Sequence, residues 1–208
     1  MQFYPIEDHS WVAIDIHHNL GEQTTLLTHK SGSRYCRQLL KKLQQALNVT
    51  GELMDTNFPY HFITADGYTW YVSFSHSRQH AAVLISPYGN IGIDVEDSAI
   101  SHHVASRFFS PHEYQWLNQK PAVNQAVLRN LLWRLKECSI KVHQNADKQL
   151  TKELKHDVLD ELGEEVINQL IGADEIKAKD KPIQCVQTAA KIIGNFSRKP
   201  CSFIIVNR

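Results

Sequence analysis

The sequence has few cysteines and no long apolar run. Its four cysteines, in 208 residues, include no C-x-x-C pair, which argues against a disulfide framework or a zinc ribbon and predicts reduced thiols in a cytoplasmic protein. No apolar stretch approaches the ~20 residues that span a bilayer. The start of the chain lacks the basic and apolar regions of a secretory signal, so we expect neither export nor a membrane anchor.

The sequence also lacks an excess of charge and the common glycine motifs. Lysine and arginine number 22, as do aspartate and glutamate, so no overall field draws the protein to nucleic acid or to a membrane. An anion site would therefore be a local cluster of basic residues. The P-loop and dinucleotide glycine patterns are absent, as is the G-x-S-x-G turn of serine hydrolases.

What is present is an ordinary globular composition, 42% hydrophobic and 21% charged, with mixed patterns of strand and helix. Apolar alternation predicts strands at 11–16, on both sides of Asp66-Gly67, in a hairpin over 81–96, and at 183–193 and 201–207. Helical periodicity predicts helices at 33–47, at 123–143 and within 151–171. Ser110 and Glu113 fit a capping box for another helix that begins at Pro111. The stretch after residue 143 lacks glycine, which predicts that the helix continues. The pattern predicts an α+β fold and permits two similar halves, residues 1–90 and 91–208.

The stretch NIGIDVED, residues 90–97, raises an electrostatic question. Ile91, Ile93 and Val95 alternate with small or acidic residues, as in a strand with one apolar face. Asp94 and Glu96 then share the other face, where their like charges repel. An exposed strand face would tolerate the two like charges, and a bound cation would stabilise them.

The helix predicted over 123–143 has a second face opposite its leucine stripe. Trp133, Glu137 and Lys141 recur at four-residue spacing on that face, flanked by Lys136 and Ile140. A solvated face with a surface ion pair is one interpretation. A packing face against another part of the protein explains the apolar Trp133 and Ile140 better.

Together, Asp94, Glu96 and Glu137 would supply carboxylates from a strand and a helix. Oxygen ligands of this kind suit a hard cation, above all Mg²⁺, which shares itself with phosphate. Lys136 and Lys141 beside these acids would hold that phosphate. This hypothesis depends on the strand acids and the helix acid meeting in space.

Four motifs in series give the chain a family resemblance. They are Ser75-His76-Ser77, GIDVE at 92–96, FSPHE at 109–113 and WRLKECSIK at 133–141. In order and spacing they resemble the phosphopantetheinyl transferases of the surfactin-synthetase type. The resemblance covers residues 59–143, and the last motif is specific.

The resemblance implies two α+β halves related by a pseudo-twofold, with a substrate cleft between them. It implies Mg²⁺-dependent transfer of the 4′-phosphopantetheine arm from coenzyme A to a serine of an apo acyl or peptidyl carrier protein, releasing 3′,5′-ADP. Asp94, Glu96 and Glu137 would bind the metal, and Glu137 and Lys141 would be catalytic. The implied contacts with coenzyme A are Ser75, His76, Lys136 and Lys141. Two fused halves also suggest a monomer.

One family feature is replaced here. A lysine that reaches the coenzyme often precedes the proline before the Ser-His-Ser segment, but this chain has Phe58 before Pro59. The missing charge could come from a basic residue elsewhere: Lys30, Arg34, Arg37 or Arg78. Two other functions share the acidic residues: a non-catalytic module that binds coenzyme A or a carrier, and a magnesium phosphohydrolase that uses water in place of a serine.

Overall fold

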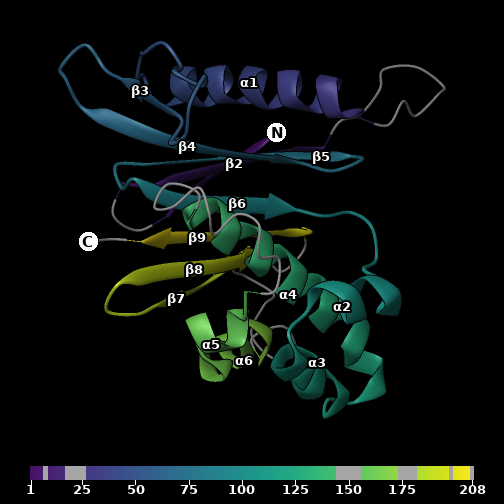
Figure 1. Cartoon of the computed structure of the whole chain (residues 1–208). Coiled ribbons are helices and arrows are strands. Elements are labelled where there is room, and N and C mark those ends of the chain that lie inside the picture. Colours follow the sequence, from purple (N-terminus) through teal and green to yellow (C-terminus); the bar gives the residue numbers. More distant parts are fainter. Residues whose placement is uncertain (7–8, 17–26, 144–155, 173–181, 197–198, 207–208) are drawn as a thin grey trace.

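Two antiparallel sheets packed face to face form the centre of the protein (Figure 1). The computed structural model describes residues 1–6, 9–16, 27–143, 156–172, 182–196 and 199–206. The first sheet contains, in spatial order, β1 (Gln2–Pro5), β2 (Trp11–Ile16), β5 (His80–Ser86), β4 (Thr69–His76) and β3 (His61–Ile63). The second contains β6 (Asn90–Val95), β9 (Cys201–Val206), β8 (Lys191–Phe196) and β7 (Ile183–Gln187).

Helices cover the outer faces of both sheets (Figure 1). On the first sheet lies α1 (His29–Ala46), and on the second lies α4 (Ala122–His143). Four shorter helices pack around α4: α2 (His102–Phe108), α3 (Pro111–Asn118), α5 (Val158–Leu162) and α6 (Glu164–Gly172). The α+β fold class is confirmed. The pseudo-twofold and the division at residue 90 stay predictions.

The two-residue period of the strands sorts their side chains between layers. In β2, Val12 and Ile14 join the core between the sheets, whereas Ala13 packs under α1. In β9, Phe203 and Ile205 face the same inter-sheet core, and Ile204 faces α4. Strands buried on both faces explain the nearly continuous apolar runs in the sequence.

One predicted hairpin is wrong. Residues 81–96 resemble two strands joined by a tight turn, but β5 pairs with β2 and β4, whereas β6 pairs with β9. Residues 87–89 instead carry the chain from one sheet to the other. Alternation reveals strands but not their partners, and the partner of β6 lies more than a hundred residues further along the chain.

The hairpin at Asp66-Gly67 is confirmed, since β3 pairs with β4 and Gly67 has a φ of 85° that favours glycine. The helix over 123–143 is also confirmed within one residue. Residues 183–193, read as one strand, contain β7 and the start of β8.

Capping explains where two helices begin. Ser110 and Glu113 form the predicted capping box of α3, with Pro111 at its first position. Helix α1 begins at His29 rather than Ser33, because Thr28 accepts from the Ser31 amide and starts the helix one turn earlier. The predicted continuation of helix beyond 143 falls in residues 144–155, outside the described residues.

None of the described helices is both long enough and apolar enough to cross a bilayer. Cys36, Cys138 and Cys201 are buried thiols, and Cys185 is exposed.

Candidate active site

The two sheets meet along a row of serine hydroxyls, here called the serine seam. Because β6 is an edge strand, alternate backbone amides on its outer side need partners other than a strand. Alternate serines of β4 and the residue after it accept these hydrogen bonds: Ser73 from Ile93 at 3.2 Å, Ser75 from Val95 at 3.1 Å and Ser77 from Asp97 at 3.0 Å. The seam fixes β6 beside β4 and holds Asp94 and Glu96 where the two sheets meet.

Gly92 allows α4 to lie directly on β6. A Cβ atom at this position would fall 2.1 Å from the backbone carbonyl oxygen of Cys138, far inside van der Waals contact. The next residue back along α4 is Glu137, and Asp94 lies two residues after Gly92 on the same face of β6. The close approach therefore brings the helix acid toward the strand acids.

Asp94 and Lys141 form the ion pair at the centre of this site. The Lys141 ammonium lies 3.0 Å from Asp94 Oδ1 and donates to the Ile93 carbonyl at 2.7 Å. Ser75 donates to the same Asp94 oxygen at 2.9 Å, and the Asp94 side chain is only 10% exposed. Burial lowers the pKa of Lys141, but the charges of Asp94 and Glu137 outweigh it and raise the pKa above its usual value.

Glu96 and Glu137 complete the acidic group. Glu96 Oε1 accepts from the Ser77 hydroxyl at 3.2 Å and from the Ser98 amide at 2.7 Å. Glu137 is half-buried, and within the described residues its carboxylate makes neither a hydrogen bond nor an ion pair. Burial, followed by the charge of Asp94, raises the pKa of Glu137. Glu137 directly precedes Cys138, whose backbone carbonyl lies against Gly92 of β6, so the backbone of α4 carries Glu137 close to the strand that bears Asp94.

The three acids are ligands of the type that binds a hard cation, but their present side-chain torsions do not close around one. Asp94, Glu96 and Glu137 offer only carboxylate oxygens, the set that Mg²⁺ prefers. Their oxygens are not, however, among the described groups in which three ligand atoms all lie within 4.8 Å of one another. Lys141 also occupies one oxygen of Asp94. The backbone thus brings the three acids to one place, and closing them around an ion requires other glutamate torsions.

His76, at the end of β4, is positioned by α1. A Cβ atom at Gly32 would fall 2.5 Å from the His76 ring, and the rings of His29 and His76 lie 5.7 Å apart in an edge-to-face arrangement. Burial lowers the pKa of His76, and the neighbouring charges of His29 and Lys141 lower it further. The structure therefore places the His76 ring against α1.

Lys136 lies apart from the other predicted site residues. Its side chain is 1% exposed, and its ammonium pairs with the buried carboxylate of Glu113 at 2.9 Å. The same ammonium donates to the His156 carbonyl and lies 5.8 Å from the Phe109 ring centroid. The structure thus brings Lys141, but not the Lys136 ammonium, to the acids, because neighbouring helix residues point about 100° apart.

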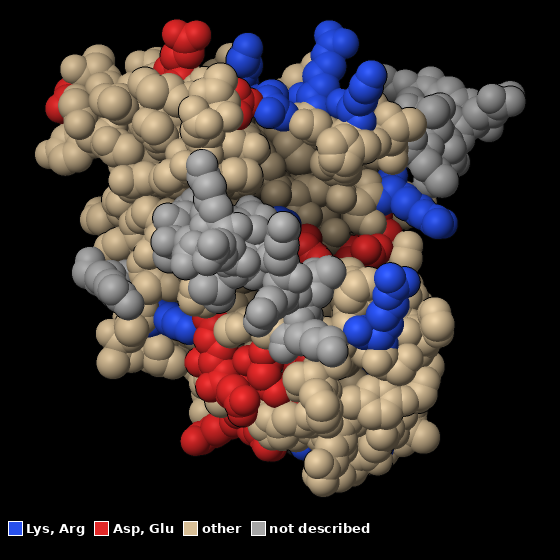
Figure 2. All heavy atoms as spheres, in the orientation of Figure 1, with Lys and Arg blue, Asp and Glu red and all other residues tan. Residues whose placement is uncertain are grey.

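Basic side chains gather above the acids. Figure 2 shows Lys and Arg along α1 and acidic side chains at the lower edge of a hollow in this face. Of the predicted candidates, Arg37 pairs with Asp55 at 2.6 Å. Lys30, Arg34 and Arg78 are exposed, and the Leu27 amide donates to the Arg78 carbonyl. These three are therefore better placed than Arg37 to meet an incoming anion.

Two further residues, Ser73 and Arg134, shape this site and were not predicted from the sequence. Ser73 belongs to the serine seam, and the two-residue steps from Ser73 to Ser75 and from Ser75 to Ser77 were a visible signal. Arg134 is buried and donates to Ser202 at 3.1 Å and to Asn195 at 3.2 Å. Burial lowers the pKa of Arg134, although Asp94 and Glu96 oppose the shift, so its charge lies near the acids. Nothing in the helical pattern distinguishes Arg134 from a surface arginine.

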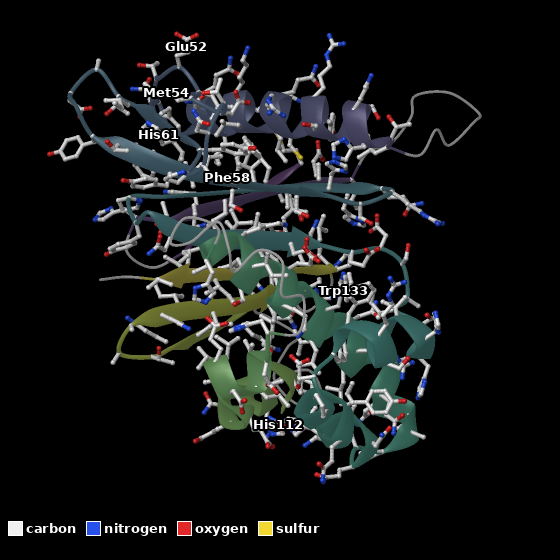
Figure 3. The ribbon with its side chains drawn as sticks, in the orientation of Figure 1. Glu52, Met54, Phe58, His61, His112 and Trp133 are labelled. Carbon is white, nitrogen blue, oxygen red and sulfur yellow. The ribbon has the colours of Figure 1, made fainter. Side chains whose placement is uncertain are left out.

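Trp133 is a packing residue. It lies on α4 (Figure 3), and its ring centroid is 5.8 Å from that of Phe108 on α2 in an edge-to-face contact. This contact agrees with the prediction that the second face of α4 packs against other residues.

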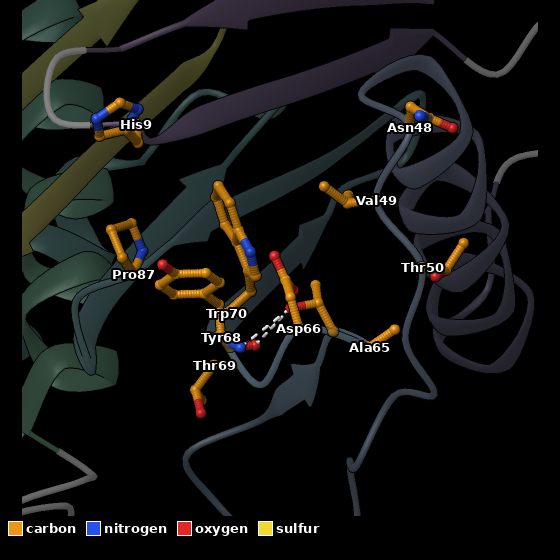
Figure 4. A pocket seen from close by; sticks show the side chains of 11 residues that line it. His9, Asn48, Val49, Thr50, Ala65, Asp66, Tyr68, Thr69, Trp70 and Pro87 are labelled. Carbon is orange, nitrogen blue, oxygen red and sulfur yellow. Dashed lines mark hydrogen bonds between the residues drawn. The ribbon is translucent and has the colours of Figure 1, made fainter.

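A separate cavity of about 660 Å³ lies at the opposite end of β4 (Figure 4). Tyr68, Trp70, His9 and Pro87 are among its lining residues. None of the predicted site residues lines it, so its size alone does not connect it with the acids.

The family comparison agrees with the location of this site. Residues 90–186 match the family model of the 4′-phosphopantetheinyl transferase superfamily. No curated protein matches the sequence significantly. The match does not distinguish the surfactin-synthetase type, but it supports a transferase that acts in phosphopantetheinyl transfer. The matched region runs from β6 into β7 and so contains Asp94, Glu96, Glu137 and Lys141. Residues 90–186, just under half of the chain, are therefore similar to the 4′-phosphopantetheinyl transferase superfamily.

Proposed function

We propose that the protein transfers the 4′-phosphopantetheine arm of coenzyme A to a serine of an apo acyl or peptidyl carrier protein. The observation that carries this proposal is the buried Asp94–Lys141 pair beside Glu137, inside the region that matches the family. Asp94, Glu96 and Glu137 would hold Mg²⁺, which when bound supplies positive charge against the diphosphate of coenzyme A.

The transfer moves one proton and exchanges one phosphorus–oxygen bond. The carrier serine oxygen attacks the β-phosphorus of coenzyme A, the bond to the α-phosphate oxygen breaks, and 3′,5′-ADP leaves. A serine hydroxyl needs a base, and Glu137 would accept its proton. The raised pKa of Glu137 suits this role, because a base is most effective with a pKa near the working pH.

Lys141 and His76 would bind the phosphates. The raised pKa of Lys141 keeps its ammonium charged, and two acceptors already orient it, Asp94 and the Ile93 carbonyl. The Lys141 ammonium could then bind the diphosphate of coenzyme A in place of Asp94, as negative charge develops on the leaving oxygen. Ser75 supports Asp94 from the seam. We leave Lys136 out of this set, because its buried ammonium is paired with Glu113.

The test combines purified protein, coenzyme A, Mg²⁺ and several apo carriers. Mass spectrometry should show the phosphopantetheine arm on at least one carrier, and omission of Mg²⁺ should stop the gain. Breakdown of coenzyme A without a carrier would instead indicate a phosphohydrolase. Binding of coenzyme A without turnover on any carrier would indicate a non-catalytic module.

Glu137→Gln should reduce turnover by about 100-fold or more, the scale of removing one essential charged group from an active site. The variant should stay folded, because Glu137 makes no hydrogen bond or ion pair within the described residues. Circular dichroism checks the fold, and Glu52→Gln, at an exposed glutamate in the other half (Figure 3), is the control. Full activity in Glu137→Gln would rule out its assigned role.

A further inference from the structure

A second group of metal-binding side chains lies where α4 ends and α5 begins. His143 is the last residue of α4, His156 precedes α5, and Glu161 lies within α5. One ligand atom from each residue lies within 4.8 Å of the other two. None of these residues belongs to the acidic site proposed for Mg²⁺.

The ligand atoms of this group are close enough together to surround one metal ion after small side-chain adjustments. His143 Nε2 lies 3.2 Å from Glu161 Oε1, and His156 Nε2 lies 2.6 Å from Glu161 Oε2. Zinc bonds of about 2.0–2.1 Å in a tetrahedron place neighbouring ligand atoms about 3.3 Å apart. The two imidazole rings are 5.5 Å apart and inclined at 64°, and one ligand atom from each of the three residues lies within 4.8 Å of the others.

The carboxylate is held in place by other side chains. Glu161 is 9% exposed, Lys191 donates to Oε1 at 2.7 Å, and the buried Ser139 hydroxyl donates to Oε2. Partners of this kind orient metal ligands in known sites. Burial raises the pKa of Glu161, but hydrogen bonds from His156, Lys191 and Ser139 outweigh it and hold the pKa well below its usual value. The carboxylate is therefore charged at neutral pH.

We propose that His143, His156 and Glu161 bind a transition metal ion of the zinc class. Two imidazoles and one carboxylate prefer Zn²⁺ and its neighbours to Mg²⁺, which favours oxygen ligands alone. An ion there would replace two nitrogen–oxygen hydrogen bonds with three metal–ligand bonds. It would join the end of α4 to the start of α5 and leave a fourth position for water.

The experiment uses the full chain after chelator treatment and desalting, with Co²⁺ and Zn²⁺ as probes. We expect the visible absorption of four-coordinate Co²⁺ to saturate at one equivalent, to disappear on addition of Zn²⁺ and to persist in excess Mg²⁺. His143→Ala and His156→Ala should each weaken Zn²⁺ binding by more than about 100-fold.

Two control variants separate this site from others. His112→Ala changes the other described group with metal-binding geometry, which contains His112, Asp157 and Asp160. Glu137→Gln changes the acidic site. Both controls should keep the Co²⁺ signal. Loss of the signal in either control together with its retention in His143→Ala would overturn the proposal.

A measurement on the unaltered protein covers the case in which the histidine variants do not fold. Zn²⁺ in excess should raise the Tm, because an ion that binds only the folded state stabilises it. No tetrahedral Co²⁺ absorption in the unaltered protein, or a Tm that Zn²⁺ does not raise, would overturn the proposal.

Discussion

At the residue scale, the candidate site depends on a glycine as much as on its acids. Gly92 lets the backbone of α4 approach β6, and only that approach brings Glu137 toward Asp94. The motif GIDVE is thus partly a packing signal. Its glycine removes a side chain where the helix must lie, and its two acids project beside the helix.

Gly92→Ala should lower the free energy of unfolding by about 1–3 kcal/mol, the usual cost of overpacking. The new Cβ would overlap the Cys138 carbonyl, so α4 must move and Glu137 with it. Turnover should fall as well. Urea denaturation and the carrier assay measure the two effects.

Gly89→Ala is the matched control, because a Cβ there meets its nearest atom, in the Tyr71 ring, at 3.4 Å. Equal effects of the two substitutions would contradict the proposed role of Gly92.

The residue scale also shows what helical spacing predicts well. Trp133, Glu137 and Lys141 were grouped by four-residue steps, and Glu137 and Lys141 do lie together beside Asp94. Lys136 was added for its proximity in sequence, and the structure directs its ammonium to Glu113. Helical spacing could not predict the pair of Lys136 and Glu113, because Glu113 belongs to another helix. Its role in the capping box also explained Glu113 without any ion pair.

At the scale of secondary-structure elements, patterns of neighbouring residues predicted where helices begin and where the chain turns, but not which strands pair. The capping box at Ser110 and the turn at Asp66-Gly67 depend on neighbouring residues, so they were readable in the sequence. The partners of β6 depend on contacts far along the chain, which alternation does not encode. The grouping of the candidate acids was suggested by motif order, not by strand pairing, and it stays a prediction.

A hydrogen bond between Tyr35 and Asp15 connects α1 to strand β2 of the first sheet. The Tyr35 hydroxyl donates to Asp15 Oδ2 at 2.6 Å, and the Ile16 amide donates to Oδ1 at 3.1 Å. Burial raises the pKa of Asp15, but the Met1 amine and Tyr35 outweigh it and lower the pKa below its usual value. The charged form of Asp15 therefore stabilises the folded protein.

Asp15→Asn should lower the free energy of unfolding at pH 7 by about 1–3 kcal/mol. Because the folded pKa is the lower one, this contribution is complete above about pH 4 and is lost as the pH falls through the folded pKa. The difference between the variant and the unaltered protein should shrink in that acidic range. Urea denaturation across pH measures it, and a difference independent of pH would contradict the assignment.

At the scale of the whole molecule, the serine seam joins the two sheets on the side where the acids lie. Side-chain hydroxyls, rather than strand pairing, connect β4 to β6. The apolar core between the sheets fills the rest of the contact. The relative position of the two sheets, and hence of His76 and Asp94, therefore depends on a few hydrogen bonds.

Ser73→Ala should lower the free energy of unfolding by about 1–3 kcal/mol, because it leaves the buried Ile93 amide without its acceptor. Ser73 is outside the proposed set of coenzyme-binding residues, so stability can be measured apart from ligand contacts. Ser106→Ala, at an exposed serine in α2, should change stability by about 0.5 kcal/mol or less. Thermal unfolding of both variants checks the difference.

The seam has a further consequence for solubility. An open strand edge is a template on which another chain can add a strand, and proteins with such edges tend to aggregate. Along β6 the amides that a foreign strand would recruit are already bound to hydroxyls of the same molecule. The seam thereby keeps this edge of the second sheet closed to intermolecular sheet growth.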